Sequence, residues 1–170
     1  MIWAFKNALG TVEDLERARS ATSGPFVTEV FPALALPSRN AAFHGRQMGP
    51  RDNPMRRKTF QLPHWAAVVH CAAEVGESLA VQGIRGWCDT HCSIAKLGKA
   101  HQDLLDAVLC ALLGLTWMTR ARAESIMIGD LVSGYMVAPA SPAVRARLSA
   151  AAALRGVPVD GRIAAAVSPP

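Results

Sequence analysis

The sequence lacks the long hydrophobic run that would let the chain cross a membrane. Its uncharged stretch Ala107–Met118 falls short of the about 20 apolar residues that span a bilayer. The first residues, MIWAFKNALG, also lack the long apolar stretch and small-residue cleavage site of a signal peptide. No internal repeat is present. These absences predict a cytoplasmic protein with reduced thiols and no membrane association.

The cysteines lack the spacing of a zinc site. Cys88 and Cys92 enclose the segment CDTHC, in which the gap is not the usual two residues, and no second Cys/His pair follows. Cys71 and Cys110 fall within helical patterns and are expected to be small core residues. A zinc knuckle is therefore the less favoured interpretation of CDTHC.

Positive charge is concentrated in one part of the chain. An apolar content of 51% excludes disorder as the general state, and 170 residues predict one domain with a core of ordinary size. The formal net charge is +5, and Arg39–Lys58 holds six basic residues and one acid, which is the whole excess. This favours a loop that faces a polyanion, with a solvated surface loop as the alternative. The residues expected to contact phosphates are Arg46, Arg51, Arg56, Arg57 and Lys58.

The N-terminal part of the chain is expected to contain one helix and one strand. Apolar residues recur at helical spacing over Ile2–Ser20, with charged residues on the opposite face. The β-rich segment Pro25–Phe31 predicts a short core strand. Residues Ala33–Phe43 are ambiguous, with a broken short helix as one interpretation. Residues His44–Lys58 are rich in Arg, Gly, Pro, Asn and Asp and predict a loop.

The rest of the chain predicts three helices and a hairpin. A helix over Pro63–Ala80 begins with a proline suited to its first turn. Residues Val81–Gly98 are irregular, with a weak signal for a strand at Ile84–Trp87. The later elements are a central helix over residues 101–119, a hairpin of Ser125–Ile128 and Tyr135–Ala138 around GDLVSG, a helix from Ser141 to Leu154, and a loosely ordered tail over Arg155–Pro170.

The central helix carries two acids of uncertain purpose. Almost every position after Gln102 in Lys99–Arg120 is apolar, which predicts a helix packed on most sides. Asp103 and Asp106 are three residues apart and share one face near the helix start. One interpretation is that Asp103 favours the helix dipole and Asp106 is solvated. The other is a carboxylate pair at the mouth of a site, because a buried carboxylate is costly unless it binds something.

A third acid, Glu29, is the single charge of the strand predicted at Pro25–Phe31. It lies either at a solvent-exposed edge of the sheet or in a functional site, and its apolar neighbours favour the functional site. If Glu29, Asp103 and Asp106 converge, their mutual repulsion requires a cation. Oxygen ligands favour Mg²⁺ or Mn²⁺, and such ions support phosphodiester hydrolysis. The basic loop would then hold the phosphate backbone.

Four ordered segments resemble a known bacterial family. They are EVFPALAL from Glu29, NPMRRKTF from Asn53, KAHQDLLDAVLCALLGL from Lys99 and IGDLVSGYMVAP from Ile128, and they span roughly residues 28–148. The segments look like a domain-of-unknown-function family described as predicted RNase H-like nucleases. The resemblance implies an α/β, RNase H-like fold and a metal-dependent nuclease. By this resemblance Glu29 matches the acid of the fourth strand, and Asp103 and Asp106 match a D-x-x-D-A pattern on the last core helix.

The chain departs from that family at its start. The family opens with three strands, the first of which carries a catalytic Asp, whereas no strand is predicted in Met1–Gly24. We therefore expect an N-terminally incomplete RNase H-like domain over residues 1–154, with a weakened or inactive site. The missing strands would leave Pro25–Phe31 as an exposed edge through which homodimers form. The alternatives are a non-catalytic remnant that binds nucleic acid or protein, and an incomplete gene product without a stable fold.

Overall fold

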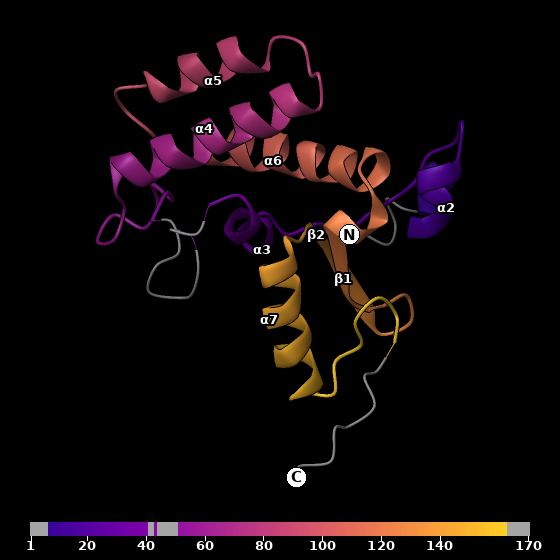
Figure 1. The fold of residues 1–170 in the computed structure, drawn as a ribbon. Coiled ribbons are helices and arrows are strands. Elements are labelled where there is room, and N and C mark those ends of the chain that lie inside the picture. The colour runs from indigo at the N-terminus through magenta and orange to yellow at the C-terminus, as the bar shows by residue number, and fades with distance from the viewer. Residues whose placement is uncertain (1–6, 41–42, 44–50, 163–170) are drawn as a thin grey trace. The chain divides into compact units, whose positions relative to one another are not determined.

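A computed structural model describes residues 7–40, 43 and 51–162 (Figure 1). The chain divides into two compact units. Unit 1 comprises Met1–Phe31 and Thr116–Pro170, and unit 2 comprises Pro32–Leu115. The described residues form a mixed α/β structure in which helices dominate and the one sheet is a two-stranded antiparallel hairpin. The predicted α/β class is confirmed at this level.

Unit 2 is built from helices. Its elements are α3 (Pro32–Ala35), the 3₁₀ helix η1 (Leu36–Ser38), α4 (Leu62–Ser78), α5 (Ile84–Cys92) and most of α6 (Lys99–Thr119). α4 begins after the extended residue Gln61 with a proline in its first turn, as the sequence predicts. The weak strand prediction at residues 84–87 is wrong, because these residues open α5. Gly83, with φ of 75°, turns the chain into that helix.

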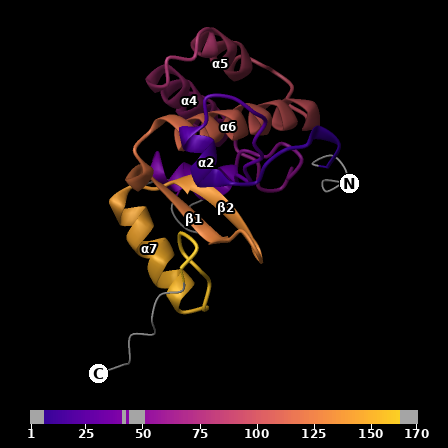
Figure 2. The same ribbon diagram turned by 90° about the vertical axis from the view of Figure 1, so that its right-hand side faces the viewer.

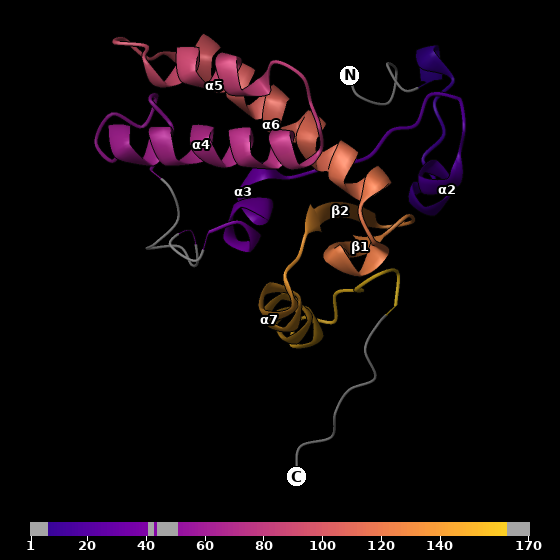
Figure 3. The same cartoon turned by 45° about the horizontal axis from the view of Figure 1, so that its top comes forward.

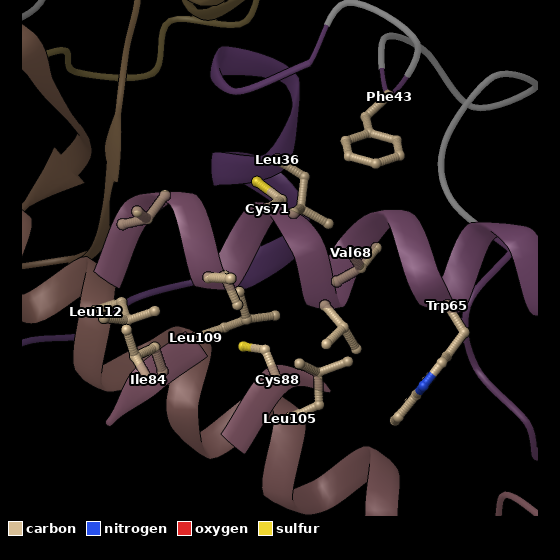
Figure 4. Packing of buried hydrophobic residues seen from close by; sticks show 14 residues of the cluster. Leu36, Phe43, Trp65, Val68, Cys71, Ile84, Cys88, Leu105, Leu109 and Leu112 are labelled. Carbon is tan, nitrogen blue, oxygen red and sulfur yellow. The ribbon is translucent and has the colours of Figure 1, made fainter. Parts of the chain in front are cut away.

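The core of unit 2 lies between α4, α5 and α6 (Figures 3 and 4). Trp65 and Val68 of α4 are completely buried, as are Cys88 of α5 and Leu105 of α6. α4 and α5 pack closely at Gly76, where a Cβ atom would lie 2.5 Å from Cγ1 of Ile84. The helices can approach this closely only because position 76 has no side chain.

Helix α6 is present as predicted, but the expectation that it is buried on most sides is wrong. Leu105 and Trp117 are buried, whereas Leu104, Leu115 and Met118 are 51%, 40% and 43% exposed. By length and composition α6 is the one helix in the described residues that could cross a membrane, and 39% of its most apolar window is buried. It is an amphipathic helix with an unusually apolar exposed face.

Unit 1 contains the hairpin and two flanking helices (Figure 2). Its elements are α2 (Leu15–Ser20), η3 (Arg122–Glu124), β1 (Ser125–Asp130), β2 (Gly134–Pro139) and α7 (Pro142–Ala153), together with the end of α6. The strands pair antiparallel from Ser125–Pro139 to Asp130–Gly134, which confirms the predicted hairpin. The side chain of Ser141 accepts a hydrogen bond from the Val144 backbone and caps α7.

Two N-terminal predictions for unit 1 are wrong, those of a strand over residues 25–31 and of a continuous helix over residues 2–20. Residues 25–31 are not a regular strand, because they make only isolated parallel bridges, Phe26 with Val12 and Val30 with Val137. The helix predicted over residues 2–20 is interrupted. Residues 7–9 are helical, Gly10 turns with φ of 58°, and α2 starts at Leu15; residues 1–6 lie outside the described chain.

Part of the predicted tail packs back on β1. The Gly129 backbone donates to Pro158, and the Asp160 backbone donates to Met127, at 2.8 Å each. Val159 forms an isolated antiparallel bridge with Ile128. Residues 158–160 are therefore held against the hairpin.

Candidate functional site

Four exposed basic side chains lie on a turn-rich stretch of unit 2, which we call the cationic segment: Arg51, Arg56, Arg57 and Lys58. Its shape is set by local hydrogen bonds. The side chain of Asn53 accepts from the Met55 backbone at 2.9 Å, and the Asn53 carbonyl accepts from the Arg56 backbone at 3.0 Å. Arg46, the fifth predicted phosphate-contacting residue, lies outside the described residues.

The cationic segment is anchored to the start of α4. The Gln61 backbone donates to the Arg51 carbonyl at 2.8 Å, and the Arg51 backbone donates to Nδ1 of His64 at 2.9 Å. These bonds fix the backbone on both sides of the turns while the basic side chains stay in solvent. No acidic side chain of the described residues forms an ion pair with any of the four cations.

The predicted metal ligands fall in different units. Glu29 belongs to unit 1, where its side chain is exposed and its carbonyl accepts from the Val137 backbone at 2.9 Å. Asp103 and Asp106 belong to unit 2. Within the described residues, no three His, Cys, Asp or Glu side chains are grouped so that they could hold a metal ion.

Asp103 and Asp106 have different surroundings although both lie near the start of α6. The Asp103 side chain is 58% exposed and forms an i,i+4 ion pair with Lys99, whose Nζ donates to its two carboxylate oxygens at 2.7 and 3.0 Å. The solvated carboxylate is thus Asp103, whereas the first interpretation of the sequence assigned that role to Asp106. Asp106 is half-buried, and one of its oxygens accepts from Nε2 of Gln102 at 3.1 Å.

Gln102 links Asp106 to a residue that the sequence reasoning did not select. The Gln102 side chain also lies near enough to Asp52, a half-buried acid within the cationic segment, to lower the pKa of that carboxyl. Burial raises the pKa of Asp52 above its ordinary value; a bond to its own backbone and the nearby Gln102 side chain oppose this rise, and the charge of Asp106 adds to it. Only weak features of the sequence point to Asp52 and Gln102. Asp52 is the single acid among six cations, and Gln102 is one helical turn before Asp106.

The cysteine segment of α5 is part of the structural core. Cys88 is completely buried, and burial raises the pKa of its thiol to about 11, so the thiol stays protonated at neutral pH. His91 stacks on Trp87 with 3.6 Å between ring centroids, and its Nδ1 lies 2.9 Å from the Trp87 carbonyl. These contacts favour a packing role over a metal knuckle.

Two arginines of unit 1, Arg122 and Arg145, are paired within the fold. Asp160 pairs with Arg122 at 2.6 Å and with Arg145 at 2.8 Å, and it accepts from the Met127 backbone at 2.9 Å. Arg122 also pairs with Glu16 at 2.7 Å and stacks 4.5 Å from the ring centre of Trp117. We call Asp160, Arg122 and Arg145 the arginine–aspartate network. It ties η3, β1, α7 and the segment after α7 together.

Comparison of the chain with protein-family models, curated proteins and solved structures found no match. The chemistry of this chain's own residues is therefore the evidence for its function.

Proposed function

We propose that this chain binds the phosphate backbone of a nucleic acid through the cationic segment of unit 2. The supporting observation is that Arg51, Arg56, Arg57 and Lys58 are all exposed and none is paired with an acid of the described residues. Cations that are not neutralised inside the fold are available to a polyanion.

The chemistry of these side chains suits phosphate. A guanidinium presents a planar set of donors that matches two phosphate oxygens, while the Lys58 ammonium acts as a point charge. Phosphate contacts position a protein on nucleic acid without reading its sequence. We therefore expect binding with little sequence preference, in which released counterions make the affinity strongly dependent on salt.

The experiment is a salt titration of binding to labelled single- and double-stranded DNA and RNA, followed by fluorescence anisotropy. We expect log Kd to rise linearly with log salt, with a slope of about 3 if the four cations each contact one phosphate (about 0.7 to 0.9 per contact). Absence of binding at low salt, or an affinity independent of salt, would refute the proposal.

Metal-dependent phosphodiester hydrolysis is the second candidate. The resemblance to RNase H-like nucleases implies it, and one observation favours it: the charge of Asp106 acts on Asp52, which lies within the cationic segment, and raises its pKa. A carboxylate pair beside bound phosphates is the arrangement that such chemistry needs. We expect Mg²⁺- or Mn²⁺-dependent cleavage that Asp106→Asn abolishes. Cleavage that survives this substitution would rule out Asp106 as a ligand.

A further inference from the structure

The first turn of α4 holds both polar groups of the Arg51 backbone. The Arg51 N–H donates to Nδ1 of His64 at 2.9 Å, and the Arg51 carbonyl accepts from the Gln61 backbone at 2.8 Å. Gln61 is the N-cap residue of α4, and His64 lies in its first turn. The next residue of the helix, Trp65, is completely buried. Arg51 is therefore the point at which the cationic segment is tied to the core of unit 2.

The bond between Arg51 and His64 requires an uncharged ring. A backbone N–H can only donate, so Nδ1 of His64 must present a free lone pair. In a neutral imidazole one ring nitrogen can do so, whereas in the imidazolium ion both nitrogens carry hydrogen and neither can accept. Histidine side chains change charge between about pH 5 and pH 8. Protonation of His64 therefore removes one of the two bonds that hold Arg51.

The charged groups around the ring belong to two other segments. The first turn of α4 contains no acidic residue. On the cationic segment, the side chain of Arg51 is exposed, and Asp52 lies near enough for a charge on His64 to lower the pKa of its carboxyl. On α6, Asp106 raises the pKa of Asp52. A positive charge on His64 is thus opposed by an acid of the fold, while the Arg51 N–H loses its acceptor.

We propose that His64 is a positioning residue for the cationic segment and makes its affinity for nucleic acid dependent on pH. This inference rests on the proposed function. When the ring is neutral, Arg51 is fixed before phosphate arrives, so binding does not have to order this part of the backbone. When the ring is charged, Arg51 is held only by its bond from Gln61, and the affinity falls. His64 acts through the Arg51 backbone and not by contact with phosphate.

The test compares the wild-type chain with His64→Asn by fluorescence anisotropy, using labelled single-stranded DNA at one low salt concentration. Asn places an acceptor oxygen as many bonds from the backbone as Nδ1, and it does not titrate. At about pH 8 the two proteins should bind within about twofold of each other, because both can accept from Arg51. At about pH 5.5 the wild type should bind about fivefold more weakly than His64→Asn, the effect of one net hydrogen bond. The other histidines are common to both proteins, so their effects cancel in the ratio.

Two further variants separate positioning from packing. His64→Ala removes the acceptor, so at about pH 8 it should already bind about fivefold more weakly than the wild type. Its affinity relative to His64→Asn should not change with pH. Rescue by Asn but not by Ala would show that the acceptor atom matters. His70→Asn is the matched control, since His70 is exposed on the same helix, and its pH profile should follow that of the wild type.

A second measurement needs no nucleic acid. In the ¹⁵N-labelled full chain, nuclear magnetic resonance should detect a coupling through the hydrogen bond between the Arg51 amide nitrogen and Nδ1 of His64 at about pH 8, and lose it at about pH 5.5. The inference is overturned if this coupling is absent at the higher pH, or if the affinity ratio of the wild type to His64→Asn does not change with pH. If the coupling responds to pH but no nucleic acid binds at either pH, the proposed function fails, whereas the hydrogen bond to His64 is upheld.

Discussion

The arginine–aspartate network of unit 1 and the cationic segment of unit 2 use their basic residues in opposite ways. In unit 1, Arg122 and Arg145 are 29% exposed and share Asp160, and Arg122 also pairs with Glu16, so two carboxylates balance the two arginines within the fold. In unit 2, the four cations of the cationic segment are exposed and have no acidic partner among the described residues. The difference shows that the net charge of +5 is not a general surface property. The cations available to bind a partner are the unpaired side chains of the cationic segment.

The largest expected loss of stability comes from disrupting the arginine–aspartate network. Asp160→Asn removes both ion pairs but keeps a residue that tolerates the left-handed backbone at this position, where φ is 51°. The free energy of unfolding should fall by about 2 to 3 kcal/mol, the cost of losing charged hydrogen bonds at a partly buried site. Urea denaturation followed by circular dichroism measures it. Asp89→Asn, at an exposed position of α5, should change little; equal losses would contradict the assignment.

The second prediction concerns the pH dependence of the same network. Burial raises the pKa of Asp160, but bonds from Arg122, Arg145 and the Met127 backbone outweigh burial and leave the pKa below its ordinary value. A group with a lowered folded-state pKa stabilises the fold above its unfolded pKa, about 3.9, and loses that contribution as pH falls through the folded value.

The wild type should therefore lose stability more steeply than Asp160→Asn below about pH 4. Urea denaturation at a series of pH values gives the difference between the two proteins. A difference in free energy of unfolding that stays constant from pH 7 to pH 2 would show that Asp160 does not act through its charge. It would also contradict the electrostatic explanation of the contrast between the arginine–aspartate network and the cationic segment.

A smaller effect is expected at Lys99, which is paired but exposed. Its side chain is 70% exposed, and its partner is Asp103 on the next turn of α6. Lys99→Ala should reduce the free energy of unfolding by about 0.5 kcal/mol or less, because water screens such i,i+4 pairs. A loss above about 1 kcal/mol would show that pairing in unit 2 is as strong as in unit 1 and would weaken the comparison.

Most of the regular structure is predictable from the sequence because its signals are local. The proline at the start of α4, the Ser141 cap of α7 and the turn residues of the hairpin each act within a few residues. The segment 25–31 has strand-like composition, but a strand also needs partners along its length. Here only isolated bridges form, which composition cannot reveal.

In the candidate site, too, local features could be predicted from the sequence, whereas contacts between distant segments could not. Spacing placed Asp103 and Asp106 on one face of α6, but it did not distinguish a carboxylate held by Lys99 in solvent from one that bonds a buried Gln102. Asp52 was overlooked because it lies near Gln102 in the fold but far from it in the chain. The exposure of the cationic segment agrees with the sequence interpretation, since basic side chains in a turn-rich loop have little apolar surface to bury.

The most direct test of the central claim is a comparison of nucleic-acid affinity for two neutralised variants of unit 2. The variant Arg56→Gln/Arg57→Gln/Lys58→Gln removes unpaired cations, whereas Arg85→Gln removes an exposed arginine that is paired with Glu77. We expect the triple variant to keep the wild-type stability and to lower the salt slope by about 2 to 3, and Arg85→Gln to leave the slope unchanged. Equal slopes for the wild type and the triple variant would contradict the account.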